Sequence, residues 1–181
     1  YALHIYFTGA VVLLFHRYSG AEDLLVVTPI YKQNREEALI NRVIPLRIGL
    51  SDPVTFKELL TRVKQTMVEA VAHQNYPLEM LPELLNPAGT VDPAPGTCSR
   101  GSKIDEGSGF TLFETAVLME NIQASAYLDH IRPALTFSFS RQERILEGKI
   151  RYNPRLYRES FILGLIDHLG QLLGGALFHM D

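Results

Sequence analysis

Residues 55–79 read TFKELLTRVKQTMVEAVAHQNYPLE, and this stretch decides most of the fold. Thr55 and Glu58 form a T-x-x-E capping box, which is a signature of a helix N-terminus. Apolar residues then recur at spacings of three and four, so the sequence predicts a long amphipathic helix with one face against a core. The apolar residues on that face are Phe56, Leu59, Leu60, Val63, Met67, Ala70 and Val71.

Upstream of this helix the sequence predicts another helix and a pair of strands. Residues 6–18 are apolar on nearly every side, and Gly20 occupies the place of a helix C-cap glycine. Residues 24–29 (LLVVTP) form a short apolar run typical of a buried strand. Residues 42–48 (RVIPLRI) predict the next strand, in which Pro45 indicates an edge position or a bulge.

Downstream, Asn75 and Pro77 end the long helix, and a shorter helix is expected over residues 77–85. Residues 86–109 consist mostly of Gly, Pro, Ser, Thr and Asp, so we expect a flexible loop there. Cys98, the single cysteine of the chain, falls within this loop. An internal disulfide and a thiolate-based metal cluster are therefore excluded, and we interpret Cys98 as an incidental loop thiol.

The last third of the sequence alternates in the manner of strands and then becomes helical. Residues 110–119 predict one strand. Residues 135–140 and 146–152 alternate between apolar and polar side chains across a short link, which predicts an antiparallel hairpin. From about Glu159 we expect a helix whose packed face holds Phe161, Ile166, Leu169, Leu172, Leu173 and Leu177.

The composition is that of a soluble globular domain. Of the 181 residues, 46% are hydrophobic and 20% are charged, and the net charge is −3. The basic residues are scattered, which argues against a nucleic-acid or membrane surface. The apolar run over residues 5–15 is too short to cross a bilayer. The single cysteine favours a reducing setting, and we expect a cytoplasmic protein.

Several short motifs occur together in the order, and near the spacings, of one known family. They are LFHRYSG at 14–20, VTP at 27–29, IPLR at 44–47, HQNYPLE at 73–79, LFE at 112–114, MEN at 119–121 and EGKIRYN at 147–153. Through these motifs, of which 73–79 is the strongest, the chain resembles the C-terminal half of a condensation domain of non-ribosomal peptide synthetases. The resemblance covers almost the whole chain but less than half of a complete family member.

This resemblance implies an α/β (α+β) fold, half of a chloramphenicol-acetyltransferase-like fold with an open mixed sheet and packed helices, over residues 1–181. It also implies the acceptor side of a cleft in which an amide forms between a carrier-bound thioester donor and an amine acceptor. The family's His-His-x-x-x-Asp-Gly motif belongs to the other half and is absent from this sequence, so we expect no activity from the chain alone.

The implied partners are the N-terminal half of the domain, peptidyl or acyl carrier proteins and an adjacent adenylation domain. No cofactor is expected to bind directly, because phosphopantetheine is carried by the carrier proteins. Self-association through an exposed half-domain face is expected as well. Alternative hypotheses are a scaffold or docking module that packs against an adenylation domain without chemistry, an epimerisation domain, and a related acyltransferase.

No residue is assigned a catalytic or metal-binding role, but four residues are candidates for the substrate cleft. His73 ends the long helix, where a helix-capping role is the competing interpretation. Arg42 stands where the family usually carries an Asn, unless a shift of one residue makes Asn41 the counterpart. Arg47 has the geometry to bind a phosphopantetheine phosphate, although a structural ion pair is the commoner role of such a residue.

Overall fold

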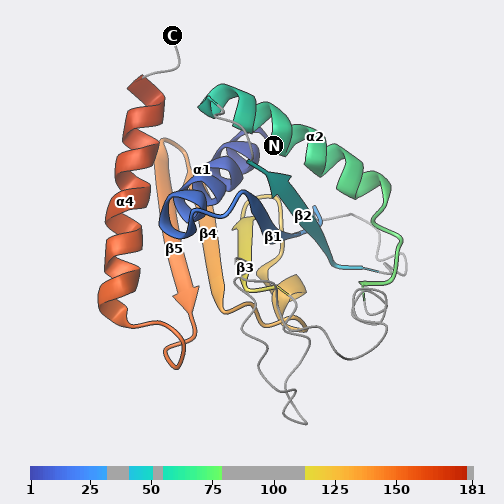
Figure 1. The fold of residues 1–181 in the computed structure, drawn as a ribbon. Coiled ribbons are helices and arrows are strands. Elements are labelled where there is room, and N and C mark those ends of the chain that lie inside the picture. Colours follow the sequence, from blue (N-terminus) through green and yellow to red (C-terminus); the bar gives the residue numbers. More distant parts are fainter. Residues whose placement is uncertain (32–40, 51–54, 79–112, 179–181) are drawn as a thin grey trace.

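The structure is a computed structural model that describes residues 1–31, 41–50, 55–78 and 113–178. A five-stranded sheet crosses the molecule in the order β2-β1-β3-β4-β5 (Figure 1). The outer pairs β1–β2 and β4–β5 are antiparallel, whereas β1–β3 and β3–β4 are parallel. The fold is therefore the open mixed α/β sheet that the resemblance implied.

The observed elements follow the predicted order closely. They are α1 (Ala2–Ser19), β1 (Asp23–Pro29), β2 (Val43–Gly49), α2 (Phe56–Ala72), β3 (Thr115–Met119), the 3₁₀ helix η2 (Ser125–Leu128), β4 (Leu135–Gln142), β5 (Ile145–Tyr152) and α4 (Glu159–Phe178). Pro45 lies in β2 at the edge of the sheet, as predicted, where a residue without an N–H is tolerated. The hairpin of β4 and β5 is confirmed, with Phe137 opposite Ile150.

Local signals set the ends of the first two helices. Gly20 adopts a left-handed conformation with φ 67°, and its N–H donates to the His16 carbonyl, which closes α1. At the start of α2, the Thr55 hydroxyl accepts from the Glu58 N–H, and the Glu58 carboxylate accepts from the Thr55 N–H at 2.8 Å. The predicted capping box is confirmed. The carboxylate also accepts from the Thr55 hydroxyl at 2.8 Å, and the bonds from the Thr55 N–H and hydroxyl hold the pKa of the Glu58 carboxyl below its usual value.

The helices α1, α2 and α4 cover one face of the sheet, with α1 in contact with the other two (Figure 1). One core cluster joins α1 and α4 to β3 and β4 around Phe137, and a second joins α1 and α2 to β1 and β2 around Leu46. A third cluster, around Leu118 and Leu128, lies on the opposite face near η2. Alternation along the strands therefore supplies apolar side chains to both faces, which makes the sheet a central layer.

The packed face of α4 agrees with the prediction in part, since Leu169 is buried and Leu172 and Leu173 pack against the core. Ile162, Leu165 and Leu169 are buried, whereas Phe161 is 37% and Ile166 is 48% exposed. Because α4 carries apolar residues around much of its circumference, the sequence did not distinguish the inward side. Contact with α1 and β4 determines it.

The predicted loop over residues 86–109 and most of the predicted helix over 77–85 lie outside the described residues. Within the described part of the chain, no helix is long and apolar enough to cross a membrane.

Candidate functional site

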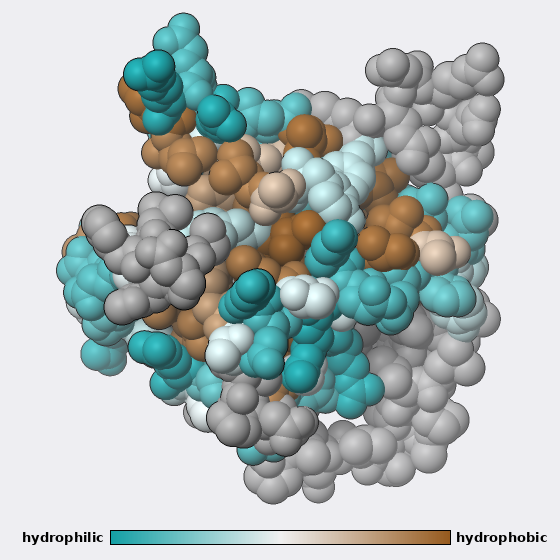
Figure 2. Space-filling view, turned by 90° about the horizontal axis from the view of Figure 1, so that it is seen from above, coloured by the Kyte–Doolittle hydropathy of each residue, from teal (hydrophilic) through white to brown (hydrophobic). Residues whose placement is uncertain are grey.

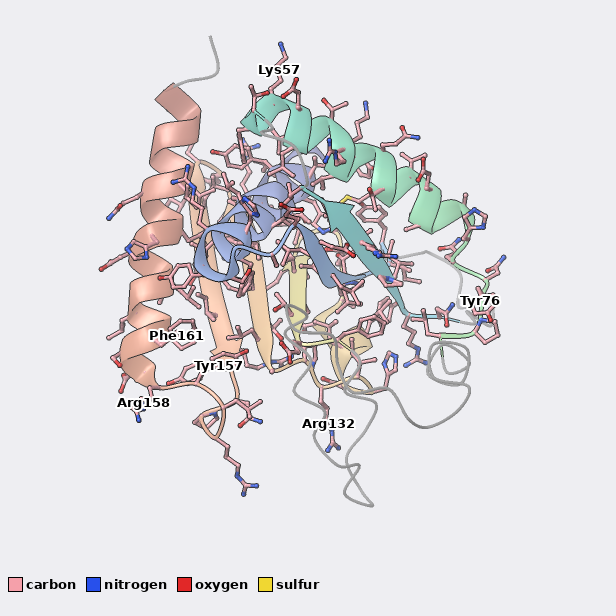
Figure 3. All side chains as sticks on the ribbon, viewed as in Figure 1. Lys57, Tyr76, Arg132, Tyr157, Arg158 and Phe161 are labelled. Atoms are coloured by element: carbon pink, nitrogen blue, oxygen red, sulfur yellow. The ribbon has the colours of Figure 1, made fainter. Side chains whose placement is uncertain are left out.

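Polar groups gather where β1 ends, β2 begins and α2 gives way to a turn. We call residues 73–78 the exit turn. Tyr76, within this turn, lies just beyond the end of α2, on the side of the molecule away from α4 (Figure 3). The Ile30 N–H donates to the Arg42 carbonyl at 3.0 Å, so the chain leaving β1 and the chain entering β2 lie side by side here.

Asn41 connects this region to the exit turn. Its Nδ2 group donates to the carbonyl of Gln74 at 2.5 Å and to the carbonyl of Tyr76. Its Oδ1 atom accepts from the N–H of Leu78 at 3.2 Å. A single half-buried side chain thus bonds to the backbone of three residues that are more than thirty positions away in the sequence.

A buried polar network lies behind the exit turn, at the carboxyl end of β1. His4 of α1 is 1% exposed, with Nε2 at 2.9 Å from the Thr28 hydroxyl and Nδ1 at 3.2 Å from the Tyr31 hydroxyl. Hydroxyl groups donate or accept, so this pair of partners satisfies a neutral imidazole. Burial, and to a smaller extent the N-terminal ammonium, lowers the pKa of His4 to about 4. Burial likewise raises the pKa of the Tyr31 phenol well above its usual value.

Gln123 completes the network from the turn that follows β3. Its Nε2 group donates to the Thr28 hydroxyl at 2.9 Å and to the Pro29 carbonyl, and its Oε1 atom accepts from the Met119 N–H at 2.7 Å. Gln123 is 1% exposed, so these bonds replace water at every polar atom of its amide. Gln123 therefore ties the parallel strands β1 and β3 together where both end.

The network and the exit turn border a small pocket of about 80 Å³. Its lining is largely apolar and includes Ile44 and Met67, with Gln74 of the exit turn on one side. His4 and Gln123 are also part of the lining. Among the described lining residues none is a carboxylate, lysine or arginine, so this part of the pocket suits a small uncharged group or ordered water.

The four cleft candidates are only partly brought together. Asn41 and the exit turn that holds His73 are joined by hydrogen bonds. His73 itself is exposed and forms the C-cap of α2, with its N–H donating to the carbonyls of Glu69 and Ala70 at 3.2 Å. Arg42 is next to Asn41, and its guanidinium lies 5.9 Å from the centre of the Tyr127 ring, a cation–π contact.

Arg47 is separate from the others, near the far end of β2. Six residues of extended chain place it roughly 20 Å from Asn41. Its guanidinium binds both carboxylate oxygens of Asp23, with the shortest contact at 2.7 Å. Arg47 therefore takes the commoner of its two expected roles, a structural ion pair, and the pair is exposed.

The sequence pattern did not single out Thr28, Tyr31 or Gln123. The available signal was a polar residue at a position that the pattern predicts to be buried: His4 at the start of an apolar helix and Thr28 inside VVTP. Such residues require hydrogen-bond partners, but which residues serve as partners depends on contacts across the sheet. Among the described residues, no group of His, Cys, Asp and Glu is arranged to hold a metal ion.

Comparison with known proteins decides the family. A family model described as the condensation domain matches residues 2–181, which is nearly the whole chain. The chain belongs to the condensation-domain family. One curated relative of this condensation-domain chain is a linear gramicidin synthase polypeptide of Brevibacillus parabrevis, 32% identical over 179 residues. Tyrocidine synthase 2, also of Brevibacillus parabrevis, is 25% identical over 181 residues. The matches cover 95% and 89% of this chain, but only 3% and 5% of those long proteins.

Solved structures agree on the fold. The starter condensation domain of rhizomide synthetase matches with a TM-score of 0.63 and 17% identity, over 96% of this chain and 42% of that structure. The X-domain from teicoplanin biosynthesis matches with a TM-score of 0.65 and 21% identity, over 94% of this chain and 40% of that structure. The condensation-domain chain thus spans about two fifths of the solved domains that it resembles.

Proposed function

We propose that this chain is the C-terminal, acceptor-side portion of a condensation domain in a non-ribosomal peptide synthetase of the cytoplasm. In this role it forms one wall of the cleft in which the amide bond is made. The observation that carries the proposal is the family match over residues 2–181, together with coverage of 38% to 42% of solved condensation domains. The region around Asn41 and the exit turn is the part of the wall that we propose faces the cleft.

The proposed reaction is aminolysis of a thioester. The acceptor amine attacks the donor carbonyl, a C–N bond forms, and the C–S bond breaks to release the phosphopantetheine thiol of a carrier protein. The proton lost by the amine is transferred to the departing sulfur, and this transfer requires a positioned base or proton shuttle. In this proposal no cofactor binds to the chain directly, since the carrier proteins supply the phosphopantetheine.

The proton shuttle is proposed to come from the N-terminal half. The His-His-x-x-x-Asp-Gly motif does not occur in the 181 residues. Within the described residues, the histidine rings that form hydrogen bonds contact hydroxyl groups or a backbone carbonyl, and no histidine pairs with a carboxylate. His4 is buried with both ring nitrogens in use, which makes it unsuited to exchange protons with a substrate.

The test compares this chain with a longer protein that includes the N-terminal half. Each is incubated with donor-loaded and acceptor-loaded carrier proteins, and the condensation product is measured by mass spectrometry. We expect product from the longer protein and none from the chain alone. Product from the chain alone would disprove the assignment of the shuttle to the other half. Absence of product from a longer protein that contains the motif would contradict the proposed activity.

Expressed alone, the chain is expected to associate with itself. Leu163 and Ile166 of α4, Leu156 before it, and Ile145 and Leu146 of the hairpin are exposed apolar residues. Figure 2 shows apolar surface lying beside polar surface on the side seen from above. We expect Leu163→Lys with Ile166→Lys to reduce the mass measured by light scattering. A monomeric mass for the wild-type chain would contradict this expectation.

A docking module is the second candidate. The specific observation in its favour is the match to the X-domain from teicoplanin biosynthesis, a domain also solved in complex with OxyB, with a TM-score of 0.65. In this alternative the chain packs against a neighbouring protein, such as an adenylation domain, without taking part in chemistry. Binding of a neighbouring domain by a longer protein that forms no amide would favour the docking role.

A further inference from the structure

The carboxamide of Asn41 has little capacity left for a ligand. An asparagine side chain has two N–H donors and one carbonyl oxygen, which can accept up to two hydrogen bonds. Both donors are used, because Nδ2 bonds to the carbonyls of Gln74 and Tyr76. The acceptor Oδ1 already receives the Leu78 N–H. These partners also settle the orientation of the amide, because an exchange of its oxygen and nitrogen would set the oxygen against two carbonyl groups.

The partners of Asn41 flank Pro77, which explains why a side chain is needed here. Proline has no N–H and biases the residue before it away from the helical conformation, so the backbone cannot continue the α2 ladder through this point. Helix α2 has already ended at Ala72, so neither the Tyr76 carbonyl nor the Leu78 N–H belongs to its hydrogen-bond ladder. Asn41 supplies a donor to the Tyr76 carbonyl and an acceptor to the Leu78 N–H, as a neighbouring peptide unit would.

Among the described residues, the exit turn has few other anchors. Within it, the Tyr76 N–H donates to the His73 carbonyl at 3.1 Å, and the Gln74 N–H donates back to Val71 at 3.3 Å. Among the described residues, Asn41 is the side chain from outside the turn that bonds to its backbone. Gln74 lines the small pocket beside His4 and Gln123, so the position of the turn also sets one side of that pocket.

We propose that Asn41 is a positioning residue: it holds the exit turn, and with it Gln74 and His73, in a fixed position on the cleft wall, and it does not bind substrate itself. This inference rests on the proposed function for its effect on catalysis. The hydrogen-bond clamp itself does not depend on that function. A residue that contacts the acceptor discriminates between acceptors, whereas a positioning residue affects all of them alike.

The test uses an intact condensation domain with both halves and the variants Asn41→Ala and Asn41→Asp. Asn75→Ala is the matched control, because Asn75 is an exposed asparagine of the same turn with no described side-chain hydrogen bond. Hydrogen exchange at the Leu78 N–H reports on the clamp, and condensation kinetics with a small and a large soluble amine acceptor report on catalysis. Thermal unfolding reports on global stability.

In Asn41→Ala we expect exchange at Leu78 to rise about tenfold, in line with the loss of a hydrogen bond of typical strength. We expect kcat to fall by a similar factor for both acceptors, with KM within about twofold and an unfolding midpoint lowered by only a few degrees. Near neutral pH we expect Asn41→Asp to show faster exchange at Leu78 and a lower kcat than Asn41→Ala, because its carboxylate faces two carbonyl oxygens. Both values are expected to recover as the pH falls, since the protonated carboxyl regains a donor. Asn75→Ala is expected to leave exchange at the Leu78 N–H as it is in the wild type.

Unchanged exchange at Leu78 in Asn41→Ala would overturn the clamp. A loss confined to one acceptor, or to KM, would show that Asn41 contacts substrate instead. If the wild-type domain forms no amide, the proposed function fails, while the exchange measurement still decides whether Asn41 holds the exit turn.

Discussion

Protonation of His4 is expected to destabilise the folded chain in mild acid. Burial keeps the imidazole neutral and lowers its pKa from 6.5 to about 4. Between these values the unfolded chain binds a proton that the folded chain does not, so the free energy of unfolding falls as the pH decreases. From pH 7.5 to pH 5.0 the loss through His4 alone is about 2 kcal/mol, and it approaches roughly 3 kcal/mol below pH 4.

Urea unfolding followed by circular dichroism at pH 7.5 and pH 5.0 measures this effect. His4→Gln retains a donor and an acceptor for Thr28 and Tyr31 but does not titrate in this range. His73→Gln is the control, because His73 is exposed. We expect the wild type and His73→Gln to lose about 2 kcal/mol more than His4→Gln on acidification. Equal losses in all three proteins would refute the view that His4 is buried as the neutral form.

Further predictions concern the cap of α2, the network and α4. Thr55→Ala should lower the free energy of unfolding by about 1 kcal/mol, while Thr55→Ser should keep most of the wild-type stability. Equal stability of the wild type and both variants would argue against the capping box. Gln123→Leu should lower the free energy of unfolding by about 2 kcal/mol, because the Met119 N–H loses its buried partner. Gln65→Leu, on the exposed side of α2, should change the free energy of unfolding little. Gly170→Ala should stabilise the chain by up to about 1 kcal/mol, since a Cβ there meets no atom within 4 Å; a decrease in the urea midpoint would contradict this.

Much of the secondary structure was predictable because its signals are local. The capping box of Thr55 and Glu58, the left-handed Gly20 and the alternation of β4 and β5 each depend on residues a few positions apart. The hydrogen bonds and periodicities that these residues impose are the same wherever the segment lies in a protein. The family motifs add the resemblance to condensation domains, and the fold class is what that resemblance implies.

The contacts of the candidate site were not predictable in the same way. Asn41 was a candidate through the resemblance, but its bonds to the exit turn cross more than thirty residues and require β2 and α2 to be packed together. Gln123, which follows β3, bonds to Thr28 in the neighbouring parallel strand β1. The sequence shows that a buried polar group needs a partner, and only the packing shows which residue it is.

The amino-acid sequence by itself determined most of the helices and strands and the capped start of α2, because these follow from interactions between near neighbours along the chain. Its ordered motifs also carried the family resemblance. Only the tertiary structure decided which side of α4 is buried, that Arg47 pairs with Asp23 far from the exit turn, and that Asn41 bonds to the backbone on both sides of Pro77. Each of these depends on which elements meet in space, and long-range packing sets that arrangement.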